Sequence, residues 1–597
     1  MVSRSRTRRR SGVCFEVLDR WRLKCDGILR KVADMKTVSS TGLSIVSRRK
    51  FLQAASLASL AVAGSGLALA AETQVRRRMK NVNTTYLADA ARLACRTMGN
   101  VFNEADRDIP FFASWVTPDV GLAWNPDHSE AHVPGRHLNG LLHAETAFGL
   151  KIPDDVIAKH ERAAFFSYGG ALPLPLNRKA ITDAQPARFL PHNLREGFHA
   201  LYALTRFRKS DRARELAEQS IQTIFELWNP ASGWNRAKIE AKGLELIEWQ
   251  GNFITGIARC IGPLVKFYEA TKHGPALELA LALKSKAMRE YFLPDGSYDW
   301  ERFGAHTHST TCTMSSLAHL AQLTNDANLL DRVRLFFDNG LRAISDDLGW
   351  SIENTHPNNA VPDRGEVNNS GDILETALIL GRHGYPQYSQ FAERSLRGHI
   401  LPSQLRDISF IKDNKPADGK LSLAQRHLGA FGFPTPYGHA PMEGGQISFN
   451  MDIVGGSTDS ICYAHEYSSD FSKGTHRVHL LFDRETDALK ITSPYPERPL
   501  EITLKNPGAL WVRMPSWVEQ EKLKVLAGET QLTPRFSNNY AFLPKPPVNV
   551  PIRFSFPLPT SELTLKHRTR DIRVRLKGDS VIAMQNFGAD LTFFDEI

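Results

Sequence analysis

The segment Arg364-Gly-Glu-Val-Asn-Asn-Ser-Gly-Asp-Ile-Leu-Glu375 sets polar residues directly before an apolar stretch with helical spacing. Asn369 or Ser370 can cap a helix there, and Asp372 follows Asn369 at the spacing of a capping box. The sequence therefore predicts a loop that leads into a helix beginning near Ser370. Glu366 and Asp372 would flank the positive end of that helix, where backbone amides stabilise carboxylates or an anionic group.

Helix, turn, helix units recur on both sides of this segment, from about residue 83 to 400. The predicted turns lie near Gly149, Thr205, Thr271, Thr324 and Arg382. A helix over Thr84–Gly99 and a late helix around Ser457–Tyr467 raise the number to about six pairs. Regular repetition of this kind indicates stacked or circular hairpins, so we expect residues 83–470 to form an (α/α)6 helical toroid with equivalent helix ends at one mouth.

From about residue 475 the pattern changes to alternation of apolar and polar residues, which is typical of half-buried strands. The predicted strands are Val478–Phe482, Leu489–Thr492, Leu500–Leu504, Leu510–Met514, Ile552–Phe556 and Ile572–Leu576. We expect residues 475–597 to form an antiparallel β-sandwich. The predicted fold class is therefore mainly α with a C-terminal β domain.

The basic character of the chain is concentrated in its first residues. Residues 1–71 carry 14 of the 74 Lys and Arg residues and 4 of the 64 Asp and Glu residues, so the remainder holds 60 of each sign. A formally neutral body gives no reason to expect nucleic acid or membrane as a partner. Nothing in the sequence indicates an oligomeric state.

The basic head is predicted to be an export signal. Ser47-Arg-Arg-Lys-Phe-Leu-Gln53 resembles a twin-arginine motif, and the mildly apolar Ala54–Ala70 ends in small residues suited to cleavage. The apolar run is short and weakly apolar, so we expect no stable membrane insertion after cleavage. The protein is therefore expected in the periplasm or secreted, and Met35 would begin a signal of more usual length.

Four motifs, taken in order, resemble the β-L-arabinofuranosidases of glycoside hydrolase family 127. They are Gly135-Arg-His-Leu-Asn-Gly-Leu-Leu142, Asn193-Leu-Arg-Glu196, Leu396-Arg-Gly-His-Ile-Leu-Pro-Ser-Gln404 and Leu510-Trp-Val-Arg-Met-Pro-Ser-Trp517. The resemblance spans most of residues 130–590. It implies a helical toroid followed by a β-sandwich, and a carbohydrate substrate.

The chain departs from this family at the metal centre. The resemblance implies a Glu-x-Cys segment and a Cys-Cys pair that bind zinc and supply a cysteine nucleophile, but here the positions read Glu366-Val-Asn368 and Gly455-Gly456. Glycine has no side chain with which to coordinate zinc. The four cysteines beyond the signal, Cys95, Cys260, Cys312 and Cys462, are scattered and show no C-x-x-C spacing. We therefore expect no metal and no cofactor.

Without thiolates, hydrolysis of a glycosidic bond would need two carboxyl groups, one protonated and one ionised. Acidic residues in the predicted mouth are Glu366, Asp372, Glu443, Asp452 and Asp459. We expect Glu366 to be catalytic, with Asp372 as its nearest partner and Glu443 and Asp459 as further candidates. The alternatives are helix capping for Glu366, Asp372 and Asp459 and a solvated loop charge for Glu443.

Polar and aromatic residues in the loops before the helices are candidates for binding the sugar. The predicted set is His192, Asn193, Arg195, Trp249, Gln250, His306, His308, Tyr463 and His465. His306 and His308 could instead be metal ligands or packing residues, and a buried Trp249 would be a core residue.

Two other functions stay open at this point. A uronate polysaccharide lyase could neutralise its substrate with Asn193 or Arg195 and use His192, Tyr463 or His465 as base and acid. A carbohydrate-binding protein that has lost its nucleophile is the second alternative. The sequence contains no G-x-S-x-G, Walker A, H-E-x-x-H or dinucleotide motif. The favoured interpretation is an exported glycoside hydrolase acting on plant or algal saccharides.

Overall fold

The structure is a computed structural model that describes residues 77–79, 81–249, 253–358, 364–413, 421–431, 447–495, 497–589 and 591–597. All of them belong to one compact unit, Val75–Ile597. The predicted export signal and two predicted site residues, Gln250 and Glu443, lie outside the described residues.

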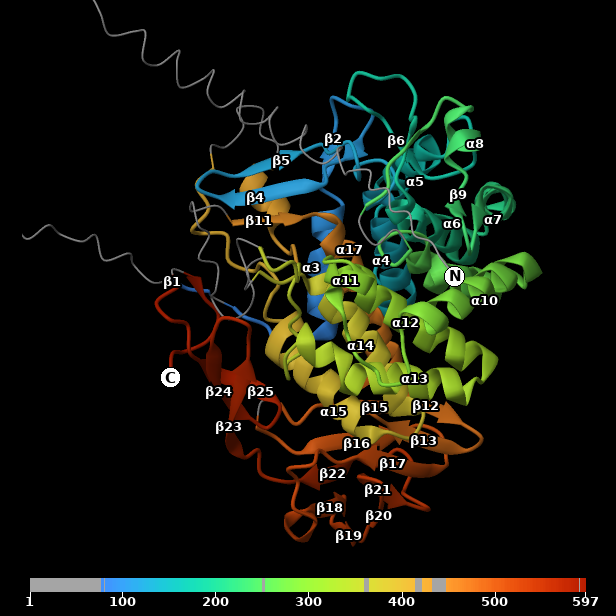
Figure 1. Cartoon of the computed structure of the whole chain (residues 1–597). Helices are drawn as coiled ribbons and strands as arrows, with labels where there is room; N and C mark the ends of the chain where they lie inside the picture. The colour runs from blue at the N-terminus through green and yellow to red at the C-terminus, as the bar shows by residue number, and fades with distance from the viewer. Residues whose placement is uncertain are drawn as a thin grey trace, which may run out of the picture. The chain divides into compact units, whose positions relative to one another are not determined.

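Six helices contact one another in a closed cycle, in the order in which they occur along the chain, and the last contacts the first. They are α4 (Val133–Phe148), α6 (Leu194–Arg208), α9 (Ile261–Thr271), α12 (Thr307–Thr324), α14 (Val367–Arg382) and α17 (Asp452–Tyr467). We call them the ring helices. Each is followed or covered by a second helix, so the region is built from helix pairs (Figure 1).

The covering helices are α3 (Leu87–Met98), α5 (Asp154–Ser167), α7 (Asp211–Leu227), α10 (Gly274–Glu290), α13 (Ala327–Asp338) and α15 (Pro386–Ser395). Helix α3 precedes the ring in sequence but contacts its last member, α17, as well as α4. The early helix and the late helix therefore form one pair. Short helices α8 (Arg236–Glu240), α11 (Trp300–Phe303) and α16 (Leu423–His427) lie in the connections.

The predicted turns agree with the ends of the ring helices at four places. Helices α4, α9 and α12 end at residues in the left-handed conformation, Gly149 (φ 65°), Lys272 (φ 59°) and Asn325 (φ 52°), and α14 ends at Arg382. A left-handed residue after the last turn is a common helix terminator. Helix α6 was predicted to end near Thr205 but continues to Arg208.

Two predicted helix starts are wrong. Helix α14 begins at Val367 with Glu366 as its N-cap, because extended backbone reaches Glu366 through the pairing of Gly365 with Ile352. Asn369 does not cap the helix, because it lies within the first turn, where its amide donates to Thr307 Oγ1 at 2.7 Å. Helix α17 begins at Asp452, earlier than the predicted Ser457, and this places Asp452 in the first turn.

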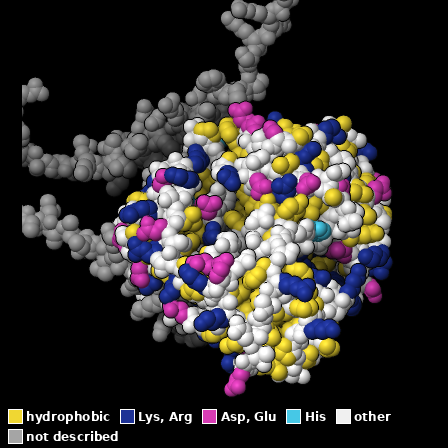
Figure 2. Space-filling model, turned by 90° about the horizontal axis from the view of Figure 1, so that it is seen from below, with side chains coloured by type: hydrophobic (Ala, Val, Ile, Leu, Met, Phe, Trp, Pro, Cys, Tyr) yellow, Lys and Arg dark blue, Asp and Glu magenta, His cyan; other side chains and the backbone are white. Residues whose placement is uncertain are grey.

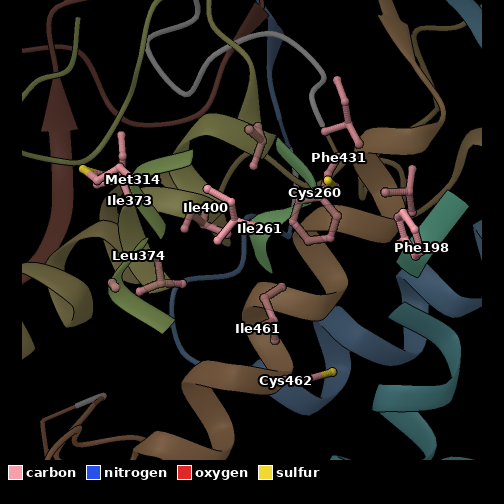
Figure 3. Close-up of a cluster of buried hydrophobic side chains, with 14 of the residues drawn as sticks. Phe198, Cys260, Ile261, Met314, Ile373, Leu374, Ile400, Phe431, Ile461 and Cys462 are labelled. Carbon is pink, nitrogen blue, oxygen red and sulfur yellow. The ribbon is translucent and has the colours of Figure 1, made fainter. Parts of the chain in front are cut away.

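The interior of the helical region is apolar where successive ring helices meet. Figure 3 shows Phe198, Ile261, Met314, Ile373 and Ile461, each from a different ring helix and each fully buried. Burial of such side chains stabilises the fold by about 1.5–3 kcal/mol each. The amphipathic spacing seen in the sequence is satisfied by this shared core.

Two larger sheets follow the helices. The first has the order β12 (Ser469–Ser472), β13 (Thr475–Val478), β17 (Ala509–Arg513), β21 (Tyr540–Leu543) and β20 (Arg535–Ser537). The second has the order β14 (Arg484–Glu485), β15 (Leu489–Thr492), β16 (Leu500–Leu504), β22 (Ile552–Ser555), β18 (Lys524–Ala527) and β19 (Thr530–Leu532). Their apolar faces contribute to one hydrophobic core, and alternate residues of β16 are buried, as the period of two predicts.

A third sheet does not share that core. It consists of β23 (Thr560–Lys566), β24 (Asp571–Lys577) and β25 (Ser580–Met584), and its buried residues, including Ile572 and Val574, belong to the core of the helical region. The predicted order of a helix-rich region and a separate sheet-rich region is confirmed. The predicted strand at residues 572–576 is also present, but its apolar face packs with the helices.

Short strands complete the structure, and most of them lie in the connections between helices. Two of the sheets have three strands: one has the order β11 (Ile447–Asn450), β4 (Ala113–Thr117) and β5 (Gly121–Ala123), and the other the order β10 (Glu245–Leu246), β7 (Arg188–Phe189) and β6 (Leu176–Asn177). Three further sheets have two strands each: β2 (Phe102–Asn103) with β3 (Ile109–Pro110), β8 (Trp228–Asn229) with β9 (Gly233–Trp234), and β1 (Arg77–Arg78) with β26 (Leu591–Thr592). The last pair is parallel and joins opposite ends of the described chain.

A buried ion cluster connects helix α15 to the first sheet. Glu393 accepts from Arg397 at 3.0 Å and from Arg513 of β17, and its side chain is completely buried. The residues that follow in the motif serve packing, because His399 lies 2.8 Å from Ser370 Oγ and Gln404 donates to backbone oxygens. This part of the family-like motif is therefore structural.

The surface carries both signs of charge. On the face shown in Figure 2, Lys and Arg side chains are interspersed with Asp and Glu. Among the described residues, no helix combines the length and the apolarity needed to cross a bilayer. The four cysteines of the described chain are buried and free.

Candidate active site

The N-terminal turns of five ring helices, with the residues just before them, bring polar side chains into one buried group, which we call the mouth cluster. Its members are His132, Arg136, Asn193, Arg195, Glu196, His306, His308, Glu366, Asn368, Asp372 and Asp452. Helix N-termini stabilise negative charge through their unpaired amides. The closed arrangement of the helices thus concentrates carboxylates where the helix dipoles favour them.

Two carboxyl groups of the cluster are bridged by one amide. Asn368 Nδ2 donates to Glu366 Oε1 at 2.9 Å and to Asp452 Oδ2 at 3.1 Å. Because both bonds end on one nitrogen, the two carboxyl oxygens lie within about 6 Å of each other. Glu366 comes from the N-cap of α14 and Asp452 from the first turn of α17.

The pKa values of the two carboxyl groups are shifted in opposite directions. Burial, with the nearby charges of Asp452 and Glu353, raises the pKa of Glu366 to about 8. Burial would also raise the pKa of Asp452, but the hydrogen bond from His132 and the charge of Arg136 outweigh it and lower the pKa to about 2. At neutral pH Glu366 is therefore protonated and Asp452 ionised, the division of roles that acid and base catalysis needs.

Three buried arginines balance the other acidic groups of the cluster. Arg259 donates to Glu196 at 2.9 Å, Arg136 approaches the same carboxylate at 3.4 Å, and Arg195 donates to Asp372 at 2.8 Å. The charges of these arginines hold the pKa of Glu196 well below its usual range despite burial. Glu196, Asp372 and Asp452 match the two arginines of the cluster and the adjoining Arg259, so these groups together are neutral only while Glu366 keeps its proton.

Asp372 belongs to the cluster but does not contact Glu366 within the described residues. Its carboxylate accepts from Arg195 and, at 3.1 Å, from Thr311. Burial raises its pKa to about 6, with Arg195 acting in the opposite direction and Glu375 adding to the rise. The partner predicted for Glu366 is thus ion-paired elsewhere, and Asp452 takes the position expected for Asp372.

Aromatic rings line one side of the cluster. His128, His132, His192, Trp249 and His306 contact one another; His192 stacks on His132 at 5.6 Å and lies 4.5 Å from Trp249. Trp249 and His306 are partly exposed, whereas the other three rings are buried. Large flat apolar faces of this kind suit stacking against a sugar ring.

The residues predicted at positions 192 and 193 are held by the backbone. His192 Nδ1 lies 2.7 Å from Thr255 O, and Asn193 Nδ2 donates to Asp127 O at 2.6 Å. Asn193 Oδ1 meets the rings of His128 at 3.3 Å and His132 at 3.0 Å. These contacts fix the rings beside Asp452 before any substrate arrives.

The positions where the resemblance implies a Cys-Cys pair have no space for a side chain. A Cβ on Gly456 would lie 2.1 Å from Asn368 Oδ1, and a Cβ on Gly455 would lie 2.5 Å from Arg136 O. Asn368 and Arg136 therefore occupy the volume that thiolates would need. The absence of cysteine at these positions is built into the packing of α4, α14 and α17.

Two groups of donors could be considered for a metal ion: His306, His308 and Glu366, and His308, Cys312 and Asp372. In both, the donor atoms lie within 4.8 Å of one another. His308 does not fit the role, because Arg136 and Arg195 donate to its Nε2 at 2.8 and 3.1 Å and place positive charge beside any cation. The zinc chemistry implied by the resemblance does not fit these residues.

Two predicted site residues, Asp459 and Tyr463, lie in a second group, the deep cluster, at the C-terminal half of α17, and a third, His465, lies near the end of that helix. There Asp459 meets His143 at 2.6 Å and Lys266 at 3.2 Å, and Tyr463 packs against Lys266. His465 packs against Phe148 near the end of the same helix, with the two rings tilted by 37°. With a rise of 1.5 Å per residue, Tyr463 is roughly 16 Å along α17 from Asp452.

The structure thus brings together Glu366, Asp372, His192, Asn193, Arg195, Trp249, His306 and His308, and separates Asp459, Tyr463 and His465 from them. Sequence reasoning weighed Asp452 without choosing it. It missed His132, Arg136, Glu196, Arg259 and Asn368. His132 and Arg136 stand one helical turn apart, a signal that could have been used, whereas Arg259 and Asn368 carry none.

No protein-family model matches the chain, and no curated protein matches it in sequence. Among solved structures, a glycoside hydrolase family 127 β-arabinofuranosidase aligns with a TM-score of 0.50 and 12% identity, over 85% of this chain and 84% of its own. A family 127 β-L-arabinofuranosidase from Geobacillus stearothermophilus aligns with a TM-score of 0.47 and 13% identity, over 83% and 80%. An unsaturated glucuronyl hydrolase from a Bacillus species aligns with a TM-score of 0.41 and 13% identity, over 63% and 96%.

The first of these similarities shows a shared fold. The resemblance to family 127 predicted from the four motifs is therefore confirmed at the level of the fold. The chemistry of the site has to be argued from its own residues, because fold alone does not define function.

Proposed function

We propose that this protein is an exported glycoside hydrolase that uses Glu366 as general acid and Asp452 as the ionised carboxylate. The observation that carries the proposal is the Asn368 bridge between two carboxyl groups with opposed pKa values. The ring helices and their covering helices would constitute the (α/α)6 toroid of residues 83–470. The two larger sheets would constitute the β-sandwich that follows it.

The close approach of the two carboxyl groups suits a retaining reaction better than an inverting one. Retaining glycosidases hold their carboxyl groups about 5–5.5 Å apart and inverting enzymes about 6.5–9.5 Å apart, and the bridge keeps Glu366 Oε1 and Asp452 Oδ2 at most about 6 Å apart. Glu366 would give its proton to the glycosidic oxygen while Asp452 forms a bond to the anomeric carbon. Water would then cleave this glycosyl ester, with Glu366 taking a proton from the water and Asp452 leaving as carboxylate.

The rings beside Asp452 give the proposed sugar site its shape. Trp249 and His306 are the partly exposed members of this wall, so they are the faces on which a sugar would stack. His306 Nε2 lies 3.8 Å from Glu366 Oε2, which places it beside the acid. Saccharides from plant or algal polysaccharides remain the proposed substrates.

A lyase mechanism is less well supported. Two of its three candidate acids and bases, Tyr463 and His465, lie far along α17 from Asn193 and Arg195. The third, His192, has its Nδ1 atom 2.7 Å from Thr255 O. Arg195 is also occupied by Asp372 and so does not offer its charge to a uronate.

The experiment is product analysis on a panel of plant and algal saccharides with the wild type, Glu366→Gln and Asp452→Asn. We expect new reducing ends without near-ultraviolet absorbance, initially in the anomeric configuration of the substrate. Glu366→Gln should lose about 10²–10⁴-fold in activity, because it removes the transferable proton and keeps the shape. The Glu485→Gln variant, altered at an exposed strand residue, is the control. Unsaturated products, or a fully active Glu366→Gln variant, would refute the proposal.

Export is part of the proposal and has its own test. Replacement of Arg48 and Arg49 by lysine should leave the precursor in the cytoplasm, since the twin-arginine pathway reads the arginine pair. The mature chain would begin near Ala71 or Glu72. Normal export of the double variant would contradict this part without touching the catalytic one.

A further inference from the structure

His308 does not use its Nε2 atom as a donor. Arg136 Nη2 and Arg195 Nη1 both donate to this atom, at 2.8 and 3.1 Å. A guanidinium group has donors and no acceptor, so Nε2 has to be the bare nitrogen of the ring. The ring proton therefore lies on Nδ1.

The surroundings of His308 agree with a neutral ring. Burial and the charges of Arg136, Arg259 and Arg195 hold the pKa of His308 well below its usual value. Asp372 Oδ2 also lies 3.4 Å from Nε2, but that carboxylate already accepts from Arg195 and Thr311 at shorter distances. The two arginine contacts decide the tautomer.

The protonated nitrogen of His308 faces the proposed acid. His308 Nδ1 lies 3.6 Å from Glu366 Oε1, and Asn368 Nδ2 donates to the same oxygen at 2.9 Å. The other oxygen, Oε2, lies 3.8 Å from His306 Nε2. Oε1 therefore accepts the Asn368 bond and is also the oxygen approached by His308 Nδ1, at a distance longer than a hydrogen bond.

We propose that His308, held in its Nδ1–H tautomer by Arg136 and Arg195, is a positioning residue that keeps the acid proton of Glu366 on Oε2. An oxygen that accepts one hydrogen bond and has a second N–H group close by acts as the carbonyl oxygen of a protonated carboxyl group, so the proton resides on the other oxygen. That oxygen is on the side of the partly exposed His306. The proton is thus presented to the proposed sugar site and not to the interior.

Other titratable and charged groups face Glu366 from the elements packed around it. They are Arg136 on α4, His306 on α12, Glu353 in the segment before α14 and Asp452 on α17. Glu353 and Asp452 are acceptors and cannot replace the donor at Oε1 while ionised. The guanidinium group of Arg136 contacts His308 and Glu196, and it makes no hydrogen bond to Glu366 among the described residues. The inference rests on the proposed function only in treating Glu366 as the acid.

A matched pair of variants separates the two nitrogens of His308. Asparagine can place an amide near the position of Nδ1, and glutamine can place one near the position of Nε2. His308→Asn can therefore keep a donor toward Glu366, whereas His308→Gln loses it. Both remove the imidazole ring, so each controls for the other's loss of packing.

The readout is the infrared carbonyl band of protonated Glu366 in the free enzyme, isolated by difference against Glu366→Gln and followed with pH. We expect His308→Gln to shift this band to higher frequency and to raise its titration midpoint by up to about 0.5 pH unit, because a polar N–H group near the carboxylate is lost while the Asn368 bond stays. His308→Asn should shift both less. Equal shifts in the two variants, or none, would overturn the proposal.

Neutron diffraction from crystals of the deuterated wild type provides a test that needs no variant to fold. Deuterium on His308 Nδ1 and Glu366 Oε2 is the expected result, and deuterium on His308 Nε2 or Glu366 Oε1 would refute it. Activity distinguishes this inference from the proposed function. If the band and the deuterium positions are as expected but no saccharide is hydrolysed, the proton placement stands and the hydrolase proposal fails.

If hydrolysis is found, kinetics add a further check. His308→Gln should lower kcat by about tenfold with little change in KM, because a misplaced proton weakens only the transition state. A parallel rise in KM with unchanged kcat would mean that His308 contacts the sugar, which contradicts the positioning role.

Discussion

Asp452 and Asp459 lie seven residues apart on one helix, α17, and their surroundings differ in kind. Asp459 is paired with Lys266 and with His143, whose pKa is raised to about 9 by its bonds to Asp459 and Glu466 despite burial. Asp452 is held by an amide and a histidine, and the neighbouring Glu366 has no cation within bonding distance among the described residues. One cluster neutralises its carboxylates with cations, while the other leaves a carboxyl group neutral by keeping its proton.

The pairing of the buried carboxyl groups distinguishes a cluster that can release a proton from one that is structural. A buried carboxylate paired with a cation cannot exchange a proton without leaving the cation uncompensated. A buried carboxyl group that is neutral at working pH can give its proton away when a substrate supplies the compensating change. The mouth cluster has the second property and the deep cluster the first.

The sharpest contrast is between Asp452→Asn and Asp459→Asn. We expect Asp452→Asn to lower kcat/KM by roughly 10⁴-fold or more, because it removes the ionised carboxylate of the reaction. Asp459→Asn should reduce stability and retain activity per folded molecule. Initial rates normalised to the folded fraction check both. Equal losses of normalised activity would show that the two clusters do not differ as argued.

Removal of the Lys266 cation from the deep cluster should destabilise the protein. Lys266→Met leaves the Asp459 carboxylate with His143 alone, and breaking one side of a buried pair costs about 3–5 kcal/mol. Urea denaturation followed by circular dichroism measures the loss. The double variant Lys266→Met, Asp459→Leu should recover part of it, because no buried charge remains. No recovery would mean that the ion pair is not the source of the effect.

A smaller effect should appear in the dependence of stability on pH. The pKa of His143 is about 9 in the folded protein and about 6.5 when exposed, so its contribution is complete below about pH 6.5 and is lost as pH rises through 9. The loss is roughly 3 kcal/mol. It should be absent in His143→Gln. Both proteins are compared in the Glu366→Gln background, because the raised pKa of Glu366 also makes stability fall with rising pH.

The smallest expected effect concerns the lost thiols. Gly456→Cys should not restore zinc binding, because Asn368 and Arg136 fill the space around that position, and overpacking should cost about 1–3 kcal/mol. Elemental analysis after dialysis against a chelator checks the metal content of this variant and of the wild type. Near one zinc per chain in the wild type would show that His306, His308 and Glu366 bind metal after all.

Sequence patterns predicted the architecture of this protein better than its site. Periodicity located the helix pairs and the strands because amphipathic burial leaves a regular trace, as in Leu500–Leu504. It also supplied an early and a late helix to complete six pairs, and α3 does contact α17. It could not show that β24 packs with the helices, since this depends on contacts between distant segments.

The site was predicted in part for the same reason. Glu366 stood out because it kept a position of the family motif, and Asp372 was chosen as its partner because it is near in sequence. The actual partner, Asp452, is 86 residues away and is joined through Asn368, whose role has no sequence signature. Asp459 looked like a capping residue and is instead the centre of a buried ion cluster.

The parallel pairing of β1 with β26 can form only late in synthesis of the chain. Arg77 pairs with Leu591, so β1 has no partner until almost all of the described chain has left the ribosome. A chain that stops before β26 would leave β1 unpaired. If the proposed twin-arginine export takes place, this pairing would form before transport, because that route accepts folded cargo.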